Sequence, residues 1–229
     1  MAFSRGPKIV TSDLVLTIDA ANTKSYPGSG TAWNDLSGNS EDFTLYNSPS
    51  FSSTTNSGTL TFDGSNDYAQ ANTAKVIPDT GAFSVVFAFA ITNTGGRGGI
   101  FERNSNAPYN GLSFGQGGAG SWYSSIIGPD DTLSLSFTYP TTNVFRIDVV
   151  TYNGSTSAKA YSNGSLVNSD TSSGIGNLSS SGTRDSMNIA RRTTNYLPVK
   201  VGCVQIYTKE LSASEVLQNY NALKGRFGL

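Results

Sequence analysis

Large apolar residues alternate with small or polar ones along much of this chain, which is the period-two pattern of β-strands. In residues 83–91 every odd position is large and apolar, while Ser84, Ala88 and Ala90 lie on the opposite face. We predict that this strand is central in its sheet. Residues 132–137 alternate strictly between Thr or Ser and a large apolar residue. That pattern is typical of a strand with one face in water.

Clusters of Gly, Pro or Asn bound the other apolar segments and mark turns between them. Residues 19–39 are rich in Asn, Ser, Gly and Pro, and they predict an ordered loop that Trp33 anchors as a structural residue. The remaining strands before and after the central region are predicted at residues 14–18, 59–62, 99–101, 112–114, 121–126, 187–190 and 199–207.

Two Asn-Gly pairs give the clearest turn signal. They separate three strand-like segments, residues 145–152, 157–161 and 165–168. Asn-Gly tolerates the positive φ angles that two-residue hairpin turns require. The sequence therefore predicts a three-stranded meander.

The last nineteen residues, 211–229, predict one helix after this run of strands. Ser212 and Glu215 have the spacing of a capping box, and Gly225 is a suitable C-terminal stop. An apolar stripe at helical spacing is expected to pack on the β-sandwich. The stripe consists of Val216, Leu217, Tyr220 and Leu223.

The composition favours many short strands joined by tight turns, since only 14% of the 229 residues are charged and 25 are Gly. No internal repeat or linker divides the chain, so we predict one domain over residues 13–229. Residues 1–12 form an N-terminal arm without an apolar pattern of its own. The arm contains Arg5, Pro7 and Lys8, and we hypothesise that it docks on a neighbouring molecule, with a disordered terminus as the commoner alternative.

The ionisable residues exclude several classes of function. Lys and Arg number 15 against 16 Asp and Glu, so no overall field attracts nucleic acid or an anionic membrane. The chain contains no histidine, which excludes Ser-His and Cys-His triads. Cys203, the single cysteine, lies in an apolar segment and is expected to be buried. Without a signal-peptide core or a membrane span, the protein is expected to be soluble and made in the cytoplasm.

Several of these segments together resemble the laminin-G-like branch of the concanavalin A-like lectin/glucanase superfamily. They are LTFDGSNDY (60–68), FSVVFAFAI (83–91), GIFERN (99–104), FRIDVVTYNGSTSAKAYSNGSLV (145–167) and QIYTKELSASEVLQNYNALKGRF (205–227). The resemblance implies an all-β fold, an antiparallel jelly-roll β-sandwich with one short C-terminal α-helix. Residues 6–39 are similar to the start of lectin-like virion proteins of tailed bacteriophages, notably marine and cyanobacterial phages.

In such phages these domains serve as head decorations, head fibres and tail adhesins, and many are presumed to bind glycans. The resemblance implies a non-enzymatic structural protein on the virion surface, as a capsid decoration or head fibre. Its partners would be other virion proteins, further copies of itself and a cell-surface glycan. The alternative is a tail adhesin or carbohydrate-binding module, and a third reading is a degenerate glycosidase.

Glycoside hydrolysis requires two placed carboxylates, and the sequence lacks the clustered acidic residues of the superfamily's glucanases. Asp130 and Asp131 lie in a turn signal with side chains pointing apart, and Asp148 stands alone in its strand. We therefore predict no catalytic residues and no enzymatic activity.

Glycan binding needs an exposed aromatic ring and planar polar groups, which several loop-like positions offer. Alternation places Trp122 and Tyr123 on opposite faces of their strand, so at most one belongs to the core. Packing of both in or under loops is the alternative. Arg191 and Arg192 could meet a carboxylate or phosphate, although adjacent arginines beside a loop are more typical of a solvated edge. The glycan-binding candidates are Asn104, Tyr109, Asn110, Trp122, Tyr123 and Tyr196.

One oxygen-rich turn is a candidate calcium site. Asp63, Asn66 and Asp67 lie within five residues and could contribute to a shell of six to eight oxygens. The competing interpretation is that the two aspartates cap a tight turn through side-chain to backbone hydrogen bonds. The sequence favours that interpretation, and calcium is the only cofactor it suggests.

Overall fold

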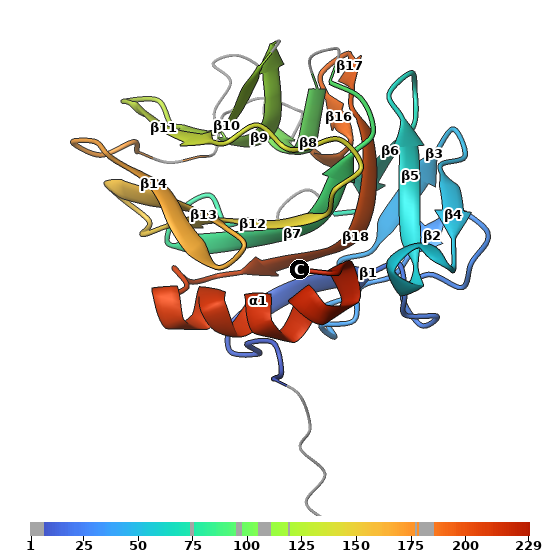
Figure 1. Cartoon of the computed structure of the whole chain (residues 1–229). Coiled ribbons are helices and arrows are strands. Elements are labelled where there is room, and N and C mark those ends of the chain that lie inside the picture. Colours follow the sequence, from blue (N-terminus) through green and yellow to red (C-terminus); the bar gives the residue numbers. More distant parts are fainter. Residues whose placement is uncertain are drawn as a thin grey trace, which may run out of the picture.

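In the part of the chain that the structure describes, two antiparallel eight-stranded sheets lie face to face, and a helix covers the outer face of one of them (Figure 1). This computed structural model describes residues 7–73, 76–94, 98–104, 111–118, 120–176, 178 and 186–229. Among the helices that it describes, none is long and apolar enough to cross a membrane.

Each sheet draws its strands from both halves of the chain. Sheet A runs in the order β14 (Ser165–Thr171), β13 (Ser157–Ser162), β12 (Arg146–Tyr152), β7 (Phe83–Ile91), β18 (Pro198–Tyr207), β5 (Thr59–Asp63) and β4 (Ser50–Ser52), and β1 (Leu14–Asp19) also pairs with β18. Sheet B runs in the order β11 (Thr132–Phe137), β10 (Ser121–Ile127), β9 (Gly111–Gly118), β8 (Gly98–Asn104), β15 (Ser186–Ile189), β6 (Tyr68–Ala71), β3 (Phe43–Tyr46) and β2 (Ala32–Trp33). The other elements are the hairpin β16 (Arg191–Arg192) and β17 (Asn195–Tyr196), the 3₁₀ turn η1 (Thr55–Ser57) and the helix α1 (Ala213–Phe227).

The predicted central strand and the predicted meander are both confirmed. Strand β7 lies between β12 and β18, and β12, β13 and β14 follow one another in sheet A. Asn163 and Gly164 have φ angles of 49° and 80°, as a two-residue turn requires. The first Asn-Gly pair forms a longer loop instead, because Asn153 bonds through its backbone N–H to the carbonyl of Ser157.

Six short strands in the described part of the chain escaped the sequence analysis: β2, β3, β4, β6, β16 and β17. Strand β2 falls inside the predicted loop of residues 19–39, although Trp33 is fully buried there as expected. These strands have two to four residues each, which is too few for a period to show. They are strands because neighbouring strands pair with them.

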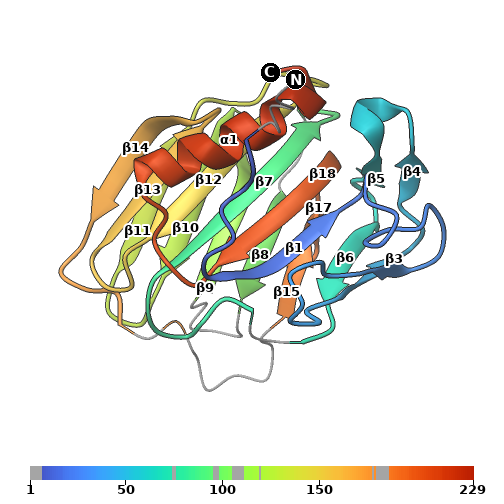
Figure 2. The same cartoon turned by 90° about the horizontal axis from the view of Figure 1, so that it is seen from below.

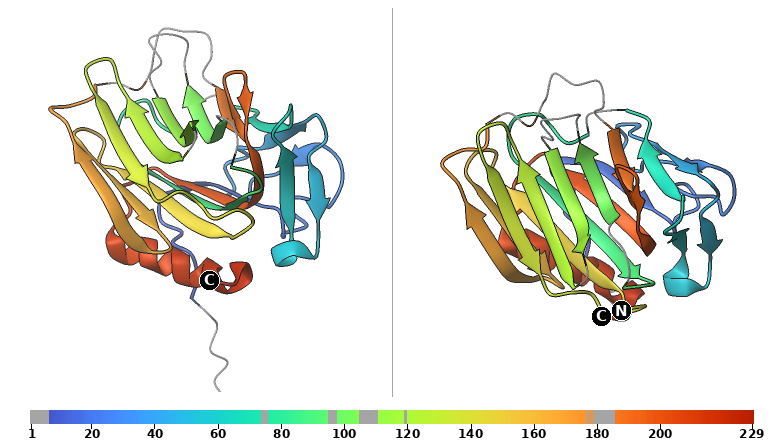
Figure 3. Two further views of the ribbon diagram at one scale, coloured as in Figure 1. Left: turned by 45° about the horizontal axis from the view of Figure 1, so that its top comes forward. Right: turned by 90° about the horizontal axis from the view of Figure 1, so that it is seen from above.

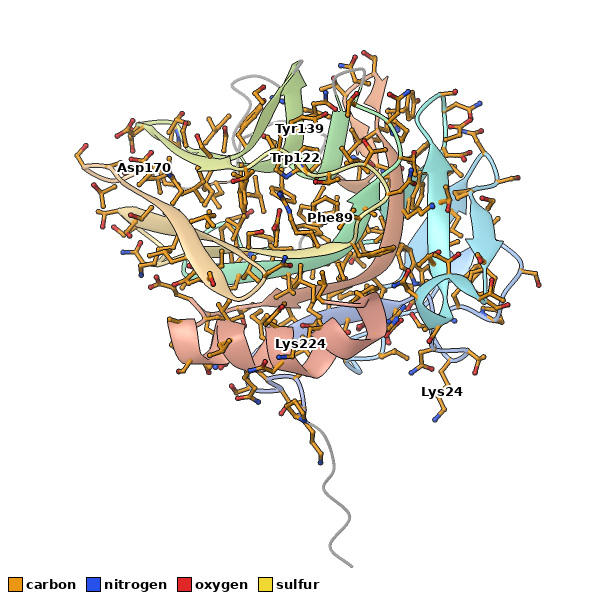
Figure 4. The ribbon with its side chains drawn as sticks, viewed as in Figure 1. Lys24, Phe89, Trp122, Tyr139, Asp170 and Lys224 are labelled. Carbon is orange, nitrogen blue, oxygen red and sulfur yellow. The ribbon has the colours of Figure 1, made fainter. Side chains whose placement is uncertain are left out.

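Aromatic rings fill the space between the two sheets. Phe87 stacks on Phe114 with ring centroids 5.1 Å apart, and Phe89 stacks on Trp122 at 5.5 Å. Figure 4 shows Phe89 and Trp122 in this interior, with Tyr139 beside them. Because stacked rings bury large apolar areas, this cluster holds the two sheets together.

Helix α1 and the outer face of sheet A form a second apolar layer (Figure 2). The predicted capping box of Ser212 and Glu215 is present. Phe227 stacks on Phe145 at 4.9 Å, and its ring fills the space that a side chain at Gly202 would need. Cys203 is buried in the same layer, as predicted, and burial raises the pKa of its thiol to about 12.

Two predictions about this helix are wrong. Leu217 is 46% exposed, because the buried positions Val216, Asn219 and Phe227 turn it towards solvent. Asn219 occupies a buried position of the helix. Its side-chain amide accepts a hydrogen bond from the Val10 N–H and donates one to the Tyr207 hydroxyl. The helix also runs past Gly225 and ends at Gly228, which adopts the left-handed conformation typical of a helix C-cap.

The expectation that residues 1–12 do not pack on their own domain is wrong for the end of this arm. Val10 is buried against sheet A and α1, and its N–H donates to Asn219 Oδ1 at 2.8 Å. The hydroxyl of Tyr207 donates to the Val10 carbonyl, and the Gln218 side chain donates to the Lys8 carbonyl. Pro7 and Lys8 are exposed, whereas the candidate attachment residue Arg5 lies outside the described residues.

We predict that Phe227→Ala lowers the free energy of unfolding by about 3–5 kcal/mol, because the lost ring leaves a cavity between α1 and sheet A. Leu217→Ala is the matched control on the same helix and should change stability by less than about 0.5 kcal/mol. Urea unfolding of both variants measures the difference. Equal losses for the two variants would contradict this packing of α1.

Candidate functional site

The outer face of sheet B is left uncovered by α1, which lies on the far side of sheet A (Figure 3). Along β3, β6, β9 and β10 the apolar side chains point into the sandwich, so the alternate positions face outward. The outward positions of these strands are Thr44, Tyr46, Tyr68, Gln70, Gly111, Ser113, Gly115, Gly117, Ser121, Tyr123, Ser125 and Ile127. Most of them are small or polar, and the large side chains among them are three tyrosines and Ile127.

Three tyrosines and one arginine gather at one end of this face, and we call them the Tyr68 cluster. Tyr46 and Tyr68 are directly opposite each other on β3 and β6, and their rings stack at 4.6 Å with an interplanar angle of 4°. Tyr196 lies 6.2 Å from Tyr68. The guanidinium carbon of Arg191 lies 4.6 Å from the centre of the Tyr68 ring, within the range of a cation–π contact.

The predicted oxygen-rich turn adjoins the Tyr68 cluster. The Asn47 side chain, next to Tyr46, donates to the Asn66 carbonyl at 2.7 Å. Within the turn, Asp63 Oδ1 accepts hydrogen bonds from the N–H groups of residues 65, 66 and 67. These N–H groups, led by that of Ser65, lower the pKa of Asp63.

The backbone bonds of this turn match the capping interpretation. Asp67 is buried, and its carboxylate accepts from the Asp63 N–H while burial raises its pKa. Among the residues that the structure describes, no group of three or more acidic, histidine or cysteine side chains is arranged to hold a metal. Calcium binding at Asp63, Asn66 and Asp67 stays a prediction.

A second aromatic group lies further along the same face, where Tyr123 packs on Gly117 and contacts Arg192. We call these three residues the Tyr123 platform. The Tyr123 ring lies so close over Gly117 that a Cβ at this glycine would come within 2.1 Å of it. The Tyr123 hydroxyl accepts a hydrogen bond from the Arg192 guanidinium, whose carbon lies 5.7 Å from the ring centre. Gly99 leaves room for the Arg192 side chain. The hairpin β16–β17 thus contributes one arginine to the Tyr68 cluster and the next to the Tyr123 platform.

The structure brings together part of the predicted glycan-binding set. Tyr123 lies on the outer face of sheet B, and Tyr196 lies beside this face on the β16–β17 hairpin. Trp122 was a wrong candidate, since it is 2% exposed and belongs to the core, as alternation with Tyr123 allowed. The Asn104 side chain and residues Tyr109 and Asn110 lie outside the described part of the chain.

Sequence reasoning missed Tyr46 and Tyr68, and for Arg191 it offered contact with a carboxylate or phosphate but favoured a solvated edge. The available signal was weak: in FTLY and YAQA a tyrosine takes one of the polar positions of a short alternating segment. Nothing in the sequence shows that two such strands pair in register and lie beside the β16–β17 hairpin.

Asp148 does not stand alone, contrary to the sequence-based expectation. Its carboxylate accepts a hydrogen bond from Arg146, two residues earlier on the same face of β12. Both side chains point between the sheets, where the Arg146 guanidinium also lies over the Phe89, Trp122 and Phe137 rings. Burial raises the pKa of Asp148 to about 6, although Arg146 acts to lower it. A carboxyl group with no exposed surface cannot reach a polysaccharide.

A second candidate surface lies away from the tyrosines. It is a pocket of about 330 Å³, and burial, followed by the nearby Asp35 and Asp42, raises the pKa of its Glu41. The pocket contains no aromatic ring, so it offers a sugar nothing to stack on. Its lining residues are Val15, Asn39, Glu41, Val76, Pro78 and Thr208.

Residues 63–217, more than half of the chain, match the Laminin_G_3 family model of the concanavalin A-like lectin/glucanases superfamily. The chain belongs to this family. Its two sheets and C-terminal helix form the concanavalin A-like jelly roll that the sequence resemblance implied. No curated protein matches the laminin-G-like chain.

Several solved structures share the laminin-G-like fold. The binding domain of Paraclostridial Mosquitocidal Protein 1 matches with a TM-score of 0.71 and 14% identity, over 92% of this chain and 52% of that one. The Botulinum neurotoxin serotype D ligand binding domain in complex with N-acetylneuraminic acid gives 0.71 and 17%, over 92% and 51%. The serotype G binding domain gives 0.68 and 18%, over 90% and 50%. The chain thus spans about half the length of these structures, and the likeness concerns the fold.

We predict that Arg146→Met costs about 3–5 kcal/mol of stability at pH 7.5, since it leaves the Asp148 carboxylate buried without a cation. Arg146→Met/Asp148→Leu is the control and should recover most of that loss, because both charges are gone. Urea unfolding of the wild type and both variants measures the effect.

The cost of Arg146→Met should also shrink as the pH falls. The folded-state pKa of Asp148, about 6, lies above its ordinary value of 3.8, so the native state binds this proton more tightly than the unfolded chain. The contribution of this group to stability therefore falls as pH rises from about 4 to about 6. Without Arg146 the folded-state pKa rises further, so the variant regains stability between pH 7.5 and 5. A pH-independent difference between wild type and variant would contradict a buried ion pair.

Proposed function

We propose that this protein is a non-enzymatic, lectin-like binding protein that holds a glycan on the outer face of sheet B. The observation that carries the proposal is the Tyr68 cluster, where stacked tyrosine rings lie on an uncovered sheet face beside a polar turn. Tyrosine rings offer apolar surface to the C–H face of a sugar, and hydroxyl and amide groups suit its hydroxyls.

The Tyr68 cluster and the Tyr123 platform together suit an extended ligand. Both lie on one sheet face, and the β16–β17 hairpin provides an arginine to each. The outward groups between and beside them include the Thr44 hydroxyl and the Gln70 amide. An oligosaccharide laid across the strands would meet aromatic and polar groups in turn.

The positions of Asp130, Asp131 and Asp148 favour a binding protein rather than a glycosidase. Asp148 is buried and paired with Arg146, and Asp130 and Asp131 are exposed in the turn between β10 and β11. Glycoside cleavage needs two carboxyl groups on either side of the scissile bond. The similar solved structures are described as binding domains, one of them in complex with N-acetylneuraminic acid, which favours the same role.

We further propose that the protein is displayed on the virion surface of a tailed bacteriophage, as a head decoration or head fibre. The similarity of residues 6–39 to lectin-like virion proteins is the support for this location. Its partners there would be other virion proteins or further copies of this chain. A tail adhesin that binds host-surface glycans is the second candidate, since the uncovered tyrosine face would serve it equally.

We expect Tyr68→Ala to weaken binding to a glycan identified on a carbohydrate array by up to about tenfold, because Tyr46 and Arg191 both pack on the Tyr68 ring and an aromatic pair is worth about 0.5–1.5 kcal/mol beyond its buried area. Tyr220→Ala, on the helix behind sheet A, is the matched control and should leave binding unchanged. Isothermal titration calorimetry gives the affinities, and thermal unfolding shows whether each variant is folded. Full affinity in a folded Tyr68→Ala variant would exclude this face.

Immunogold labelling tests the location. Antibody against this protein should decorate the heads of purified phage particles in electron micrographs, whereas labelling confined to the tail tip would favour the adhesin. Particles that carry no label while the protein is abundant in the lysate would contradict a virion role.

A further inference from the structure

Arg191 is the charged member of the Tyr68 cluster, and two contacts fix its guanidinium. Its central carbon lies over the Tyr68 ring, 4.6 Å from the ring centre. Its Nε donates to the Thr193 carbonyl at 2.9 Å, across the tip of the β16–β17 hairpin. An arginine held by a ring and a backbone carbonyl loses little further side-chain entropy on binding.

The terminal nitrogens of Arg191 have no protein acceptor in the part of the chain that the structure describes. The acidic side chains of the adjoining turn, Asp63 and Asp67, accept from backbone N–H groups within the turn itself. Neither forms an ion pair with Arg191. The positively charged guanidinium of Arg191 therefore carries paired N–H donors that neither carboxylate of this turn occupies.

The Tyr46 and Tyr196 rings support the contact between Arg191 and Tyr68. Tyr68 is stacked on Tyr46, and Tyr196 lies directly opposite Arg191 in the hairpin. A guanidinium stacked on a ring keeps its edge free, and the edge carries the N–H donors. Two parallel N–H donors match the two oxygens of a planar carboxylate better than they match a neutral hydroxyl.

We propose that the glycan bound at the outer face of sheet B contains an acidic sugar, and that Arg191 binds its carboxylate through two parallel hydrogen bonds. This inference rests on the proposed glycan-binding function and adds the class of ligand. The Tyr46 and Tyr196 rings pack beside the sugar, and the exposed Asn66 amide lies on the adjoining turn. The carboxylate belongs to a uronic or sialic acid type of residue.

The experiment compares acidic oligosaccharides with their own methyl esters, which keep the sugar and remove the charge. The probes are oligogalacturonate, oligomannuronate and sialyllactose, each as free acid and methyl ester, measured by isothermal titration calorimetry with the full chain. At least one free acid should bind the wild type about ten- to a hundredfold more tightly than its ester, as a charge-assisted bidentate pair implies.

Variants of Arg191 separate its geometry from its charge. Arg191→Gln should remove the preference for the free acid, because it weakens binding of the acid much more than binding of the ester. Arg191→Lys should restore only part of the preference, because lysine keeps the charge but lacks the planar fork. Lys224→Gln is the control, since it removes one positive charge from α1 on the far side of the molecule (Figure 4).

The outcomes distinguish this inference from the function on which it rests. Equal affinity of the wild type for acids and esters, or equal weakening of both by Arg191→Gln, would overturn the carboxylate assignment and leave glycan binding intact. Preference for sulfated over carboxylated sugars would overturn it in the same way. A wild type that binds no saccharide, acidic or neutral, would refute the glycan-binding function itself.

Discussion

Burial of both faces of sheet A is the constraint on which the rest of the structure depends. Strands β7 and β12 are buried along their whole length, so one face must meet sheet B and the other must be covered separately. Helix α1 and residue Val10 provide that cover, with Phe227 stacked on Phe145. Because α1 is used on this side, the outer face of sheet B is left uncovered, and it is there that the tyrosines and arginines gather.

The outer face of sheet B owes its shape to small residues. Gly117 allows the Tyr123 ring to approach the backbone of the sheet closely, and Gly99 makes room for Arg192. Larger side chains at these positions would lift the ring and the hairpin away. The β16–β17 hairpin lies between two aromatic groups. Arg191 therefore contacts Tyr68, and Arg192 contacts Tyr123 further along the same surface.

The buried pair of Arg146 and Asp148 shows that the role of a carboxylate in a lectin-like fold can be inferred only once its neighbours in the structure are known. In the sequence Asp148 is an isolated acid in an apolar strand. In the folded chain it faces the core, and three aromatic rings surround the arginine that neutralises it. A buried ion pair contributes little net stability, yet loss of one partner is costly. Its role is therefore structural.

The sequence by itself determined the strands with long alternation, the meander around Asn163-Gly164, the capped C-terminal helix and the burial of Cys203, because each depends on a local period or turn. It also separated Trp122 from Tyr123, though it could not say which ring was buried. Only the tertiary structure decided the rest. The Tyr68 cluster joins β3, β6 and the β16–β17 hairpin, which are far apart in the chain, and the exposure of Leu217 follows from the bonds of Asn219 to Val10 and Tyr207. These contacts are long-range, and no local pattern of residues specifies which distant strand or segment lies alongside.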